Sequence, residues 1–227
     1  MIIGIVSAIV GGLLVYFFQY FLEKFKNNKK EKEAKRLGGK TQLFLDKDFL
    51  FNYEPGKISL DKIFEELGKP LDEYSESTDS NKIEEDVKYD YNVYKYKFKN
   101  AIILFTTLLN EKNIISVTLR SIDSKYPINC PLSPASNNYV LGKAKIDSEI
   151  TDNAIASWSE TFRDWGYSAL QSRYFYRHVK YLTFTYIIHD SLDKTNNYSE
   201  FTDKVIDEVC ISQLNSIHPY IYFYEIY

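Results

Sequence analysis

Two Leu-Gly-Lys segments suggest chemistry by residue type, because phosphate-binding loops contain a glycine-lysine pair. Gly68 lies in "EELGKP" and Gly142 lies in "YVLGKA". A phosphate loop needs a second glycine five positions earlier and a Ser or Thr after the lysine, so that backbone N–H groups surround the phosphates. Neither pair meets these conditions. Gly68 instead follows apolar residues spaced i, i+3, i+4, i+7, which predicts the end of a helix.

Acidic residues and histidines offer metal-binding chemistry, but their spacing does not favour it. Residues 72–86 hold seven acidic residues and one basic residue. A calcium loop would need a further ligand and a turn glycine after Asp79, and the sequence has neither. The histidines, which lack metal-ligand spacing, are His178, His189 and His218. We therefore expect no metal site, no cofactor and no catalytic residue, and we interpret 72–86 as a solvated loop.

Basic and aromatic residues alternate in "RYFYRHVKY" (173–181), a composition that can stack on single-stranded nucleic acid. The segment 23–40 contains eight of the chain's 28 basic residues and three of its 31 acidic residues. The other residues therefore carry a net charge of about −8. Nucleic acid is therefore not an expected partner, and 173–181 is interpreted as a half-buried strand. Tyr and Trp are favoured anchors of protein interfaces. The candidate residues for a partner surface are Trp158, Trp165, Tyr174 and Tyr176.

The elements that must position these residues begin with a helix over 59–67. Ser59 is the expected N-cap and Gly68 the expected end of the helix. Pro70 keeps the helix from continuing further. The alternation in 93–100 predicts a strand with Tyr94, Tyr96 and Phe98 buried and the intervening lysines in solvent. The runs 101–109 and 114–122, separated by the turn 110–113, predict a hairpin.

The second half of the chain repeats this order loosely. Residues 124–139 contain three prolines and are expected to link two modules, 41–123 and 140–227. In the second module, 153–165 is interpreted as a helix, and the strand-like runs are 173–189 and 220–227. Whether 41–53 forms a strand or a helix stays open, as does a true duplication of the two halves.

An uncharged apolar run at 2–22 would span about 31 Å as a helix, which matches the hydrocarbon core of a bilayer. We predict a transmembrane helix over 1–22 and a basic juxtamembrane segment over 23–40. The positive charge after the span places the C-terminal domain in the cytoplasm of a single-pass protein of the cell membrane. The chain has two cysteines, Cys130 and Cys210, which is compatible with the cytoplasm, where disulfides are rare. Whether these two cysteines pair stays open.

Small residues recur along the predicted span, where they would let two helices approach closely. They are Gly4, Ser7, Ala8, Gly11 and Gly12. The lipid bilayer is thus one expected partner, and a second copy of the chain is another.

The helix ending in Leu-Gly-Lys-Pro, the acidic segment, the tyrosine-rich strand and the hairpin into "ISVTL" resemble the SmpA-type module of outer-membrane assembly lipoproteins and β-lactamase-inhibitor-protein-like folds. The resemblance covers 58–122. The whole chain, including "YPINCPL" (126–132), is also similar to an uncharacterised family of bacterial single-span membrane proteins. No lipobox cysteine follows the span, so this sequence departs from the lipoproteins there.

With 44% hydrophobic residues the chain can bury a core. We expect an α+β fold, in which an N-terminal transmembrane helix is followed by an antiparallel sheet with helices on one face; whether the two halves form a tandem duplicated module stays open. The expected function is a membrane-anchored, cytoplasm-facing module that binds an unknown protein and has no catalytic activity. The alternative is a membrane-anchored sensor or effector, of stress or antiphage defence, switched by a ligand or partner.

Overall fold

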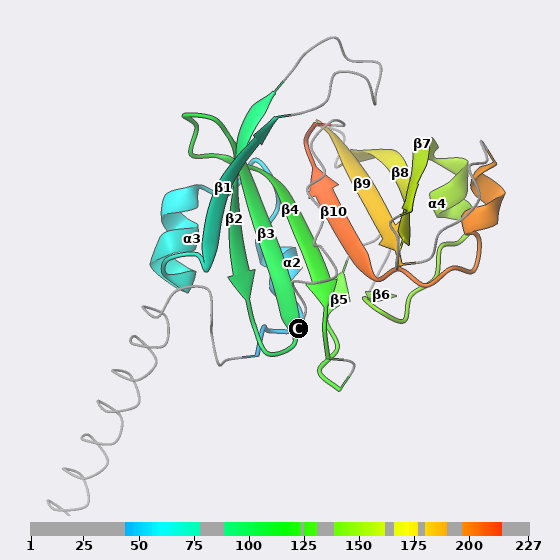
Figure 1. The fold of residues 1–227 in the computed structure, drawn as a ribbon, viewed down its shortest axis with the longest axis horizontal. Coiled ribbons are helices and arrows are strands. Elements are labelled where there is room, and N and C mark those ends of the chain that lie inside the picture. Colours follow the sequence, from blue (N-terminus) through cyan, green and yellow to red (C-terminus); the bar gives the residue numbers. More distant parts are fainter. Residues whose placement is uncertain are drawn as a thin grey trace, which may run out of the picture.

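The computed structural model describes residues 44–77, 89–123, 125–130, 139–161, 166–176, 180–189 and 197–214. Its main feature is one eight-stranded sheet, antiparallel throughout, with the order β1-β2-β3-β4-β10-β9-β8-β7 (Figure 1). The strands are β1 Asp72–Ser77, β2 Asp90–Lys97, β3 Ala101–Leu108, β4 Ile114–Ser121, β7 Ala154–Thr161, β8 Gly166–Tyr176, β9 Lys180–Ile188 and β10 Glu208–Ser212. A separate two-stranded sheet pairs β5 (Asn129–Cys130) with β6 (Tyr139–Val140).

The helices in the described residues are short. They are α2 Phe49–Asn52, α3 Leu60–Leu67, α4 Ser148–Asp152 and the 3-10 helix η1 Tyr198–Phe201. Within these ranges of the chain, no helix is long and apolar enough to cross a membrane. The predicted span, 1–22, and the basic segment, 23–40, lie outside the described residues.

The helix predicted over 59–67 is confirmed by α3. The hydroxyl of Ser59 accepts a hydrogen bond from the N–H of Lys62, which satisfies one of the unpaired donors of the first turn. Gly68 ends the helix with a φ of 79°, a backbone conformation that glycine adopts without the steric cost of a side chain. The amphipathic pattern buries Ile63 completely against the sheet.

The three strands predicted between 93 and 122 are confirmed by β2, β3 and β4. Tyr94, Tyr96 and Phe98 are buried, as the alternation predicts. However, the opposite side of β2 is not fully solvated, because Lys95 is buried as well. Both faces of this part of the sheet are therefore covered.

Residues that face one another across neighbouring strands point to the same side of a sheet. One side, here called the helix-packed face, joins the main hydrophobic cluster, which includes apolar residues of α2, α3, α4 and η1. The other side, here called the second face, carries a row of directly opposed residues that crosses six strands. That row is Lys95, Leu104, Thr118, Cys210, Thr185 and Gln171.

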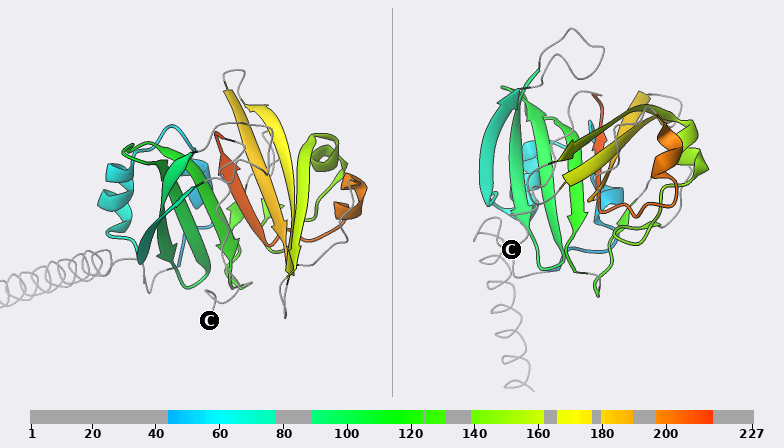
Figure 2. Two further views of the ribbon diagram at one scale, coloured as in Figure 1. Left: turned by 45° about the horizontal axis from the view of Figure 1, so that its top comes forward. Right: turned by 45° about the vertical axis from the view of Figure 1, so that its right-hand side comes forward.

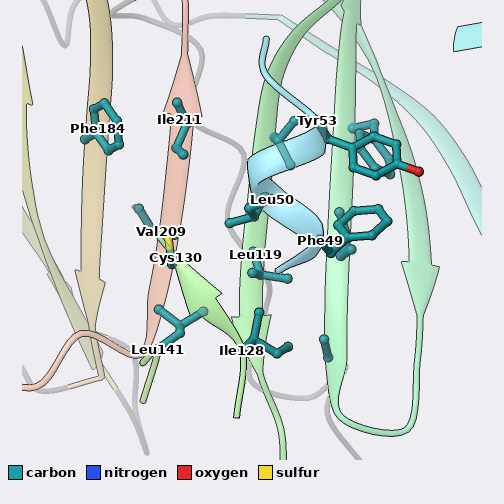
Figure 3. Packing of buried hydrophobic residues seen from close by; sticks show 14 of the residues in the cluster. Phe49, Leu50, Tyr53, Leu119, Ile128, Cys130, Leu141, Phe184, Val209 and Ile211 are labelled. Atoms are coloured by element: carbon teal, nitrogen blue, oxygen red, sulfur yellow. The ribbon is translucent and has the colours of Figure 1, made fainter. Parts of the chain in front are cut away.

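The main core lies between the helix-packed face and the short helices (Figure 3). Phe49 and Tyr53 of the α2 region stack on each other, and Tyr53 also contacts the ring of Phe105 on β3. Figure 3 shows Cys130 of β5 beside Val209 of β10, with Leu141 and Ile128 nearby. The β4–β10 pair joins the two halves into one sheet, and residues of both halves share this core (Figure 2).

The expected α+β class is wrong. One eight-stranded antiparallel sheet dominates the described residues, and the longest helix among them has eight residues. The two halves have the same order of main elements, since a short helix (α3 or α4) is followed in each by four strands that pair in chain order, and β4 and β10 meet at the centre of the sheet. They differ in that η1 lies between β9 and β10, whereas a short turn joins β3 to β4. The α+β expectation fails because, along the described residues, strand pairing satisfies most backbone groups, and only short helices pack against the sheet.

Two segments account for much of this error. Residues 154–161, expected within a helix, form β7, because Ala156 and Trp158 alternate with serines and fit the period of a strand. Residues 72–77, expected within a solvated loop, form β1 at the sheet edge. Acidic side chains are tolerated there, since charge on an edge strand discourages pairing with other chains.

Candidate interaction surface

The centre of the second face is polar and buried. Beside the row that contains Cys210 lies a row of four hydroxyl-bearing residues on β3, β4, β10 and β9, namely Thr106, Ser116, Ser212 and Thr183. All four are buried. Such side chains are small and carry a hydroxyl group, so this part of the sheet differs from the aromatic and aliphatic helix-packed face.

Charged residues continue this polar centre on the two middle strands. Arg120 on β4 and Glu208 on β10 are directly opposed and both are buried. His189 lies just beyond the end of β9, and its backbone N–H donates to the carboxylate of Asp207 at 2.9 Å. Burial, followed by the positive charge of Arg120, lowers the pKa of His189 from 6.5 to about 4, while Asp207 acts in the opposite direction. The imidazole is therefore neutral at pH 7.

The two cysteines do not pair, and they lie on opposite sides of the sheet. Cys130 belongs to the main core, whereas Cys210 lies in the central row of the second face. Burial raises the pKa of Cys210 to about 12 and raises the pKa of Cys130 further. A protonated thiol is a poor nucleophile. Among the described residues, this region thus offers hydrogen bonds and charge rather than an activated nucleophile.

An exposed cluster of two aromatic rings and one arginine lies on the same face, where β8 meets β9. Phe175 is 49% exposed and its cross-strand partner Tyr181 is 53% exposed. Their ring centroids are 4.9 Å apart, and the guanidinium carbon of Arg173 lies 4.8 Å from the centroid of the Tyr181 ring. Arg173 is exposed too. We call these three residues the hairpin cluster.

The residues proposed from the sequence as a partner surface do not lie together. Trp158 is half-buried on β7 and packs against Tyr167, Ala169 and Ile187. Tyr174 is buried in the main core, and its hydroxyl accepts a hydrogen bond from Tyr186 at 3.4 Å. Trp158 is directly opposite Ala169, so these two side chains lie on the same face of the sheet. Tyr174 is an odd number of positions from Ala169 along β8, so Trp158 and Tyr174 lie on opposite faces.

Several other predicted residues fall wholly or partly outside the described part of the chain. The backbone of Tyr176 belongs to β8, but its side chain is not described, and Trp165 lies outside the described residues. The same holds for the small residues of the predicted span. Those are Gly4, Ser7, Ala8, Gly11 and Gly12.

The glycine-lysine pairs occupy backbone turns. Gly142 has a φ of 81°, and its N–H donates to the carbonyl of Ile206 at 2.9 Å, so it turns the chain after β6. Gly68 ends α3. Within the described ranges, no group of His, Cys, Asp and Glu could hold a metal ion.

Within 173–181 the structure corrects one of the predicted residues. Tyr174 is buried in the main core, whereas its neighbour Phe175 is exposed. The alternation of a strand already separates these residues in the sequence, because Arg173 and Phe175 must point to one face and Tyr174 to the other. The choice of the exposed parity required the position of the core, which only the paired strands supply.

No family model, curated protein or solved structure matches this chain. The resemblance of 58–122 to the SmpA-type module therefore stays a prediction.

Proposed function

We propose that this chain is a membrane-anchored protein whose folded part binds a protein partner in the cytoplasm through the hairpin cluster. The observation that carries the proposal is the exposure of Phe175 and Tyr181, each about half accessible, on the same face as Arg173. A few residues provide most of the binding energy in protein interfaces, and tyrosine and arginine are enriched among them. The anchor and the orientation rest on the predicted span, 1–22, and on the basic segment that follows it.

The geometry of the cluster supports a binding role. The two rings contact each other across a strand pair, and the guanidinium group lies over one of them. These contacts hold the side chains in one arrangement, so little conformational entropy remains to be lost when a partner binds. A core role would bury both rings, and neither is buried.

Co-purification from membranes tests this proposal. The full chain is cross-linked in cells, extracted and compared with the double variant Phe175→Ser, Tyr181→Ser. We expect the double variant to lose a specific partner that the wild type retains, with at least about a tenfold reduction in yield. Leu109→Ser is the matched control, because Leu109 is exposed to a similar degree (44%) at the β3–β4 turn.

The outcome that would contradict the proposal is the same set of co-purified proteins from all three chains. Circular dichroism of the variants checks that they fold. Since the altered side chains are exposed, a fold change is not expected.

A further inference from the structure

A second exposed aromatic and basic patch lies where the described chain begins. Phe44 is 43% exposed and Tyr126 is 46% exposed, and their ring centroids are 3.9 Å apart. The Nζ atom of Lys99 lies 5.3 Å from the centroid of the Phe44 ring. Lys47 and Lys125 are exposed beside them in the sequence. We call these five residues the entry patch.

The entry patch is fixed to the sheet. The side-chain oxygen of Asn100, in the turn between β2 and β3, accepts a hydrogen bond from the N–H of Leu45 at 2.7 Å. The side-chain amide of Asn100 donates to the carbonyl groups of Leu45 at 3.1 Å and of Tyr126 at 3.4 Å. Asn100 is buried, so both backbone segments that carry the aromatic rings are attached to one point.

The position of the patch relates it to the predicted anchor. Phe44 comes four residues after Lys40, the last basic residue of 23–40, so the two are at most about 14 Å apart along the chain. Figure 1 shows the start of the described chain at the same end of the sheet as the β2–β3 turn. This end of the folded part is therefore the one that the predicted anchor holds nearest to the bilayer.

We propose that the entry patch binds the surface of an anionic lipid bilayer and orients the folded part on the membrane. This inference rests on the membrane anchor of the proposed function. A tyrosine ring is amphipathic and is favoured at the level of the lipid headgroups, and a phenylalanine ring beside it adds apolar area that can enter the boundary of the acyl chains. Each lysine near an anionic leaflet contributes attraction to the negative surface.

The local charges permit this contact. Asp46, Asp48 and Asp123 are the acidic residues next to the patch in sequence, and the carboxylate of each accepts a hydrogen bond. Asp46 accepts from the N–H of Asp48 at 2.8 Å, Asp48 accepts from the side-chain amide of Asn129 at 2.7 Å, and Asp123 accepts from the N–H of Lys125 at 2.9 Å. The ammonium group of Lys99 and both rings remain directed to the surface, whereas the rest of the folded part is acidic overall.

Lipid quenching of a site-specific fluorophore tests the inference on the full chain. Cys130 and Cys210 are buried, so a maleimide fluorophore reacts with an introduced cysteine only. Pro127→Cys places the fluorophore beside the entry patch, and Leu109→Cys places it at the other end of β3, roughly 25 Å away. Both chains are reconstituted in phosphatidylcholine vesicles, with or without about one third phosphatidylserine, that carry a headgroup quencher.

We expect at least about threefold stronger quenching at position 127 than at position 109 in the anionic vesicles. The difference should disappear when Phe44→Ser, Tyr126→Ser and Lys99→Glu are combined, and it should persist with Lys112→Glu, an exposed charge reversal at the β3–β4 turn. Equal quenching at the two positions would overturn the inference, and so would a difference that survives the triple variant.

Alkaline carbonate extraction of the same vesicles distinguishes failure of the membrane anchor from failure of the entry patch. A chain that carbonate releases has no span, and the proposed membrane anchoring then fails together with this inference. A chain that resists carbonate but shows equal quenching retains the anchor, and only the entry patch is refuted.

Discussion

Arg120 and Glu208 lie directly opposite each other at the centre of the sheet, one on the last strand of the first half and one on the last described strand of the second half. Both are buried. Opposite charges that face each other across an antiparallel pair attract, whereas a single buried charge is costly. Their positions are 88 apart in the sequence.

We expect Glu208→Leu to lower the free energy of unfolding by about 3 kcal/mol or more, because it leaves Arg120 buried opposite an apolar residue. The double variant Arg120→Met, Glu208→Leu should recover most of that loss, since both desolvation costs are removed together. Urea denaturation measures the difference. Single and double variants with additive losses would show that the two charges are not coupled.

A second prediction concerns pH. The pKa of His189 is about 4 in the folded chain, whereas an unfolded chain has the ordinary histidine value of 6.5 and so binds this proton more readily. This contribution to stability is present above pH 6.5 and is lost as the pH falls from 6.5 towards 4, by up to about 3 kcal/mol. The groups that act on the imidazole are Arg120 and Asp207. In His189→Gln, thermal unfolding between about pH 7.5 and 4 should show a shallower decline in Tm than in the wild type. Parallel declines would refute this assignment.

Asn100 provides a third prediction. Asn100→Ala removes the hydrogen bonds to Leu45 and Tyr126 and leaves buried backbone groups without them, which should cost about 2 kcal/mol of stability. Asn92→Ala is the matched control, because the hydrogen bond that Asn92 accepts from the hydroxyl of Ser75 is exposed. We expect a loss of no more than about 0.5 kcal/mol there. Chemical denaturation of both variants gives the comparison.

The predicted span supplies a fourth test. Replacing Ala8 and Gly12 with isoleucine should abolish self-association in a membrane two-hybrid assay, because close helix approach needs small side chains. Val10→Ile is the control, since it enlarges a residue between the two small positions. An unchanged signal in the double variant would leave the span as a plain anchor.

Orientation is tested by a reporter fused after Tyr227. Eight basic residues follow the predicted span within about 20 positions, so alkaline phosphatase in this fusion should be inactive. Enzymatic activity from an intact fusion would place the C-terminal domain on the other side of the membrane.

The sequence by itself determined the elements whose signals are local. Ser59 caps α3 and Gly68 ends it, because both act through backbone groups within a few residues. The alternation of Tyr94, Tyr96 and Phe98 likewise placed one side of β2 in the core. The sequence also placed the turn between β3 and β4, since two β-branched runs flank it.

The tertiary structure decided what depends on partners far along the chain. Residues 154–161 alternate only weakly, and residues 72–77 are polar. Both segments form strands because β8 and β2 pair with them. Lys95 is buried, and Phe175 rather than Tyr174 is exposed, because the two faces of a strand are assigned by the sheet around it. No local pattern places Arg120 opposite Glu208, since that register results from the pairing of β4 with β10 in one continuous sheet.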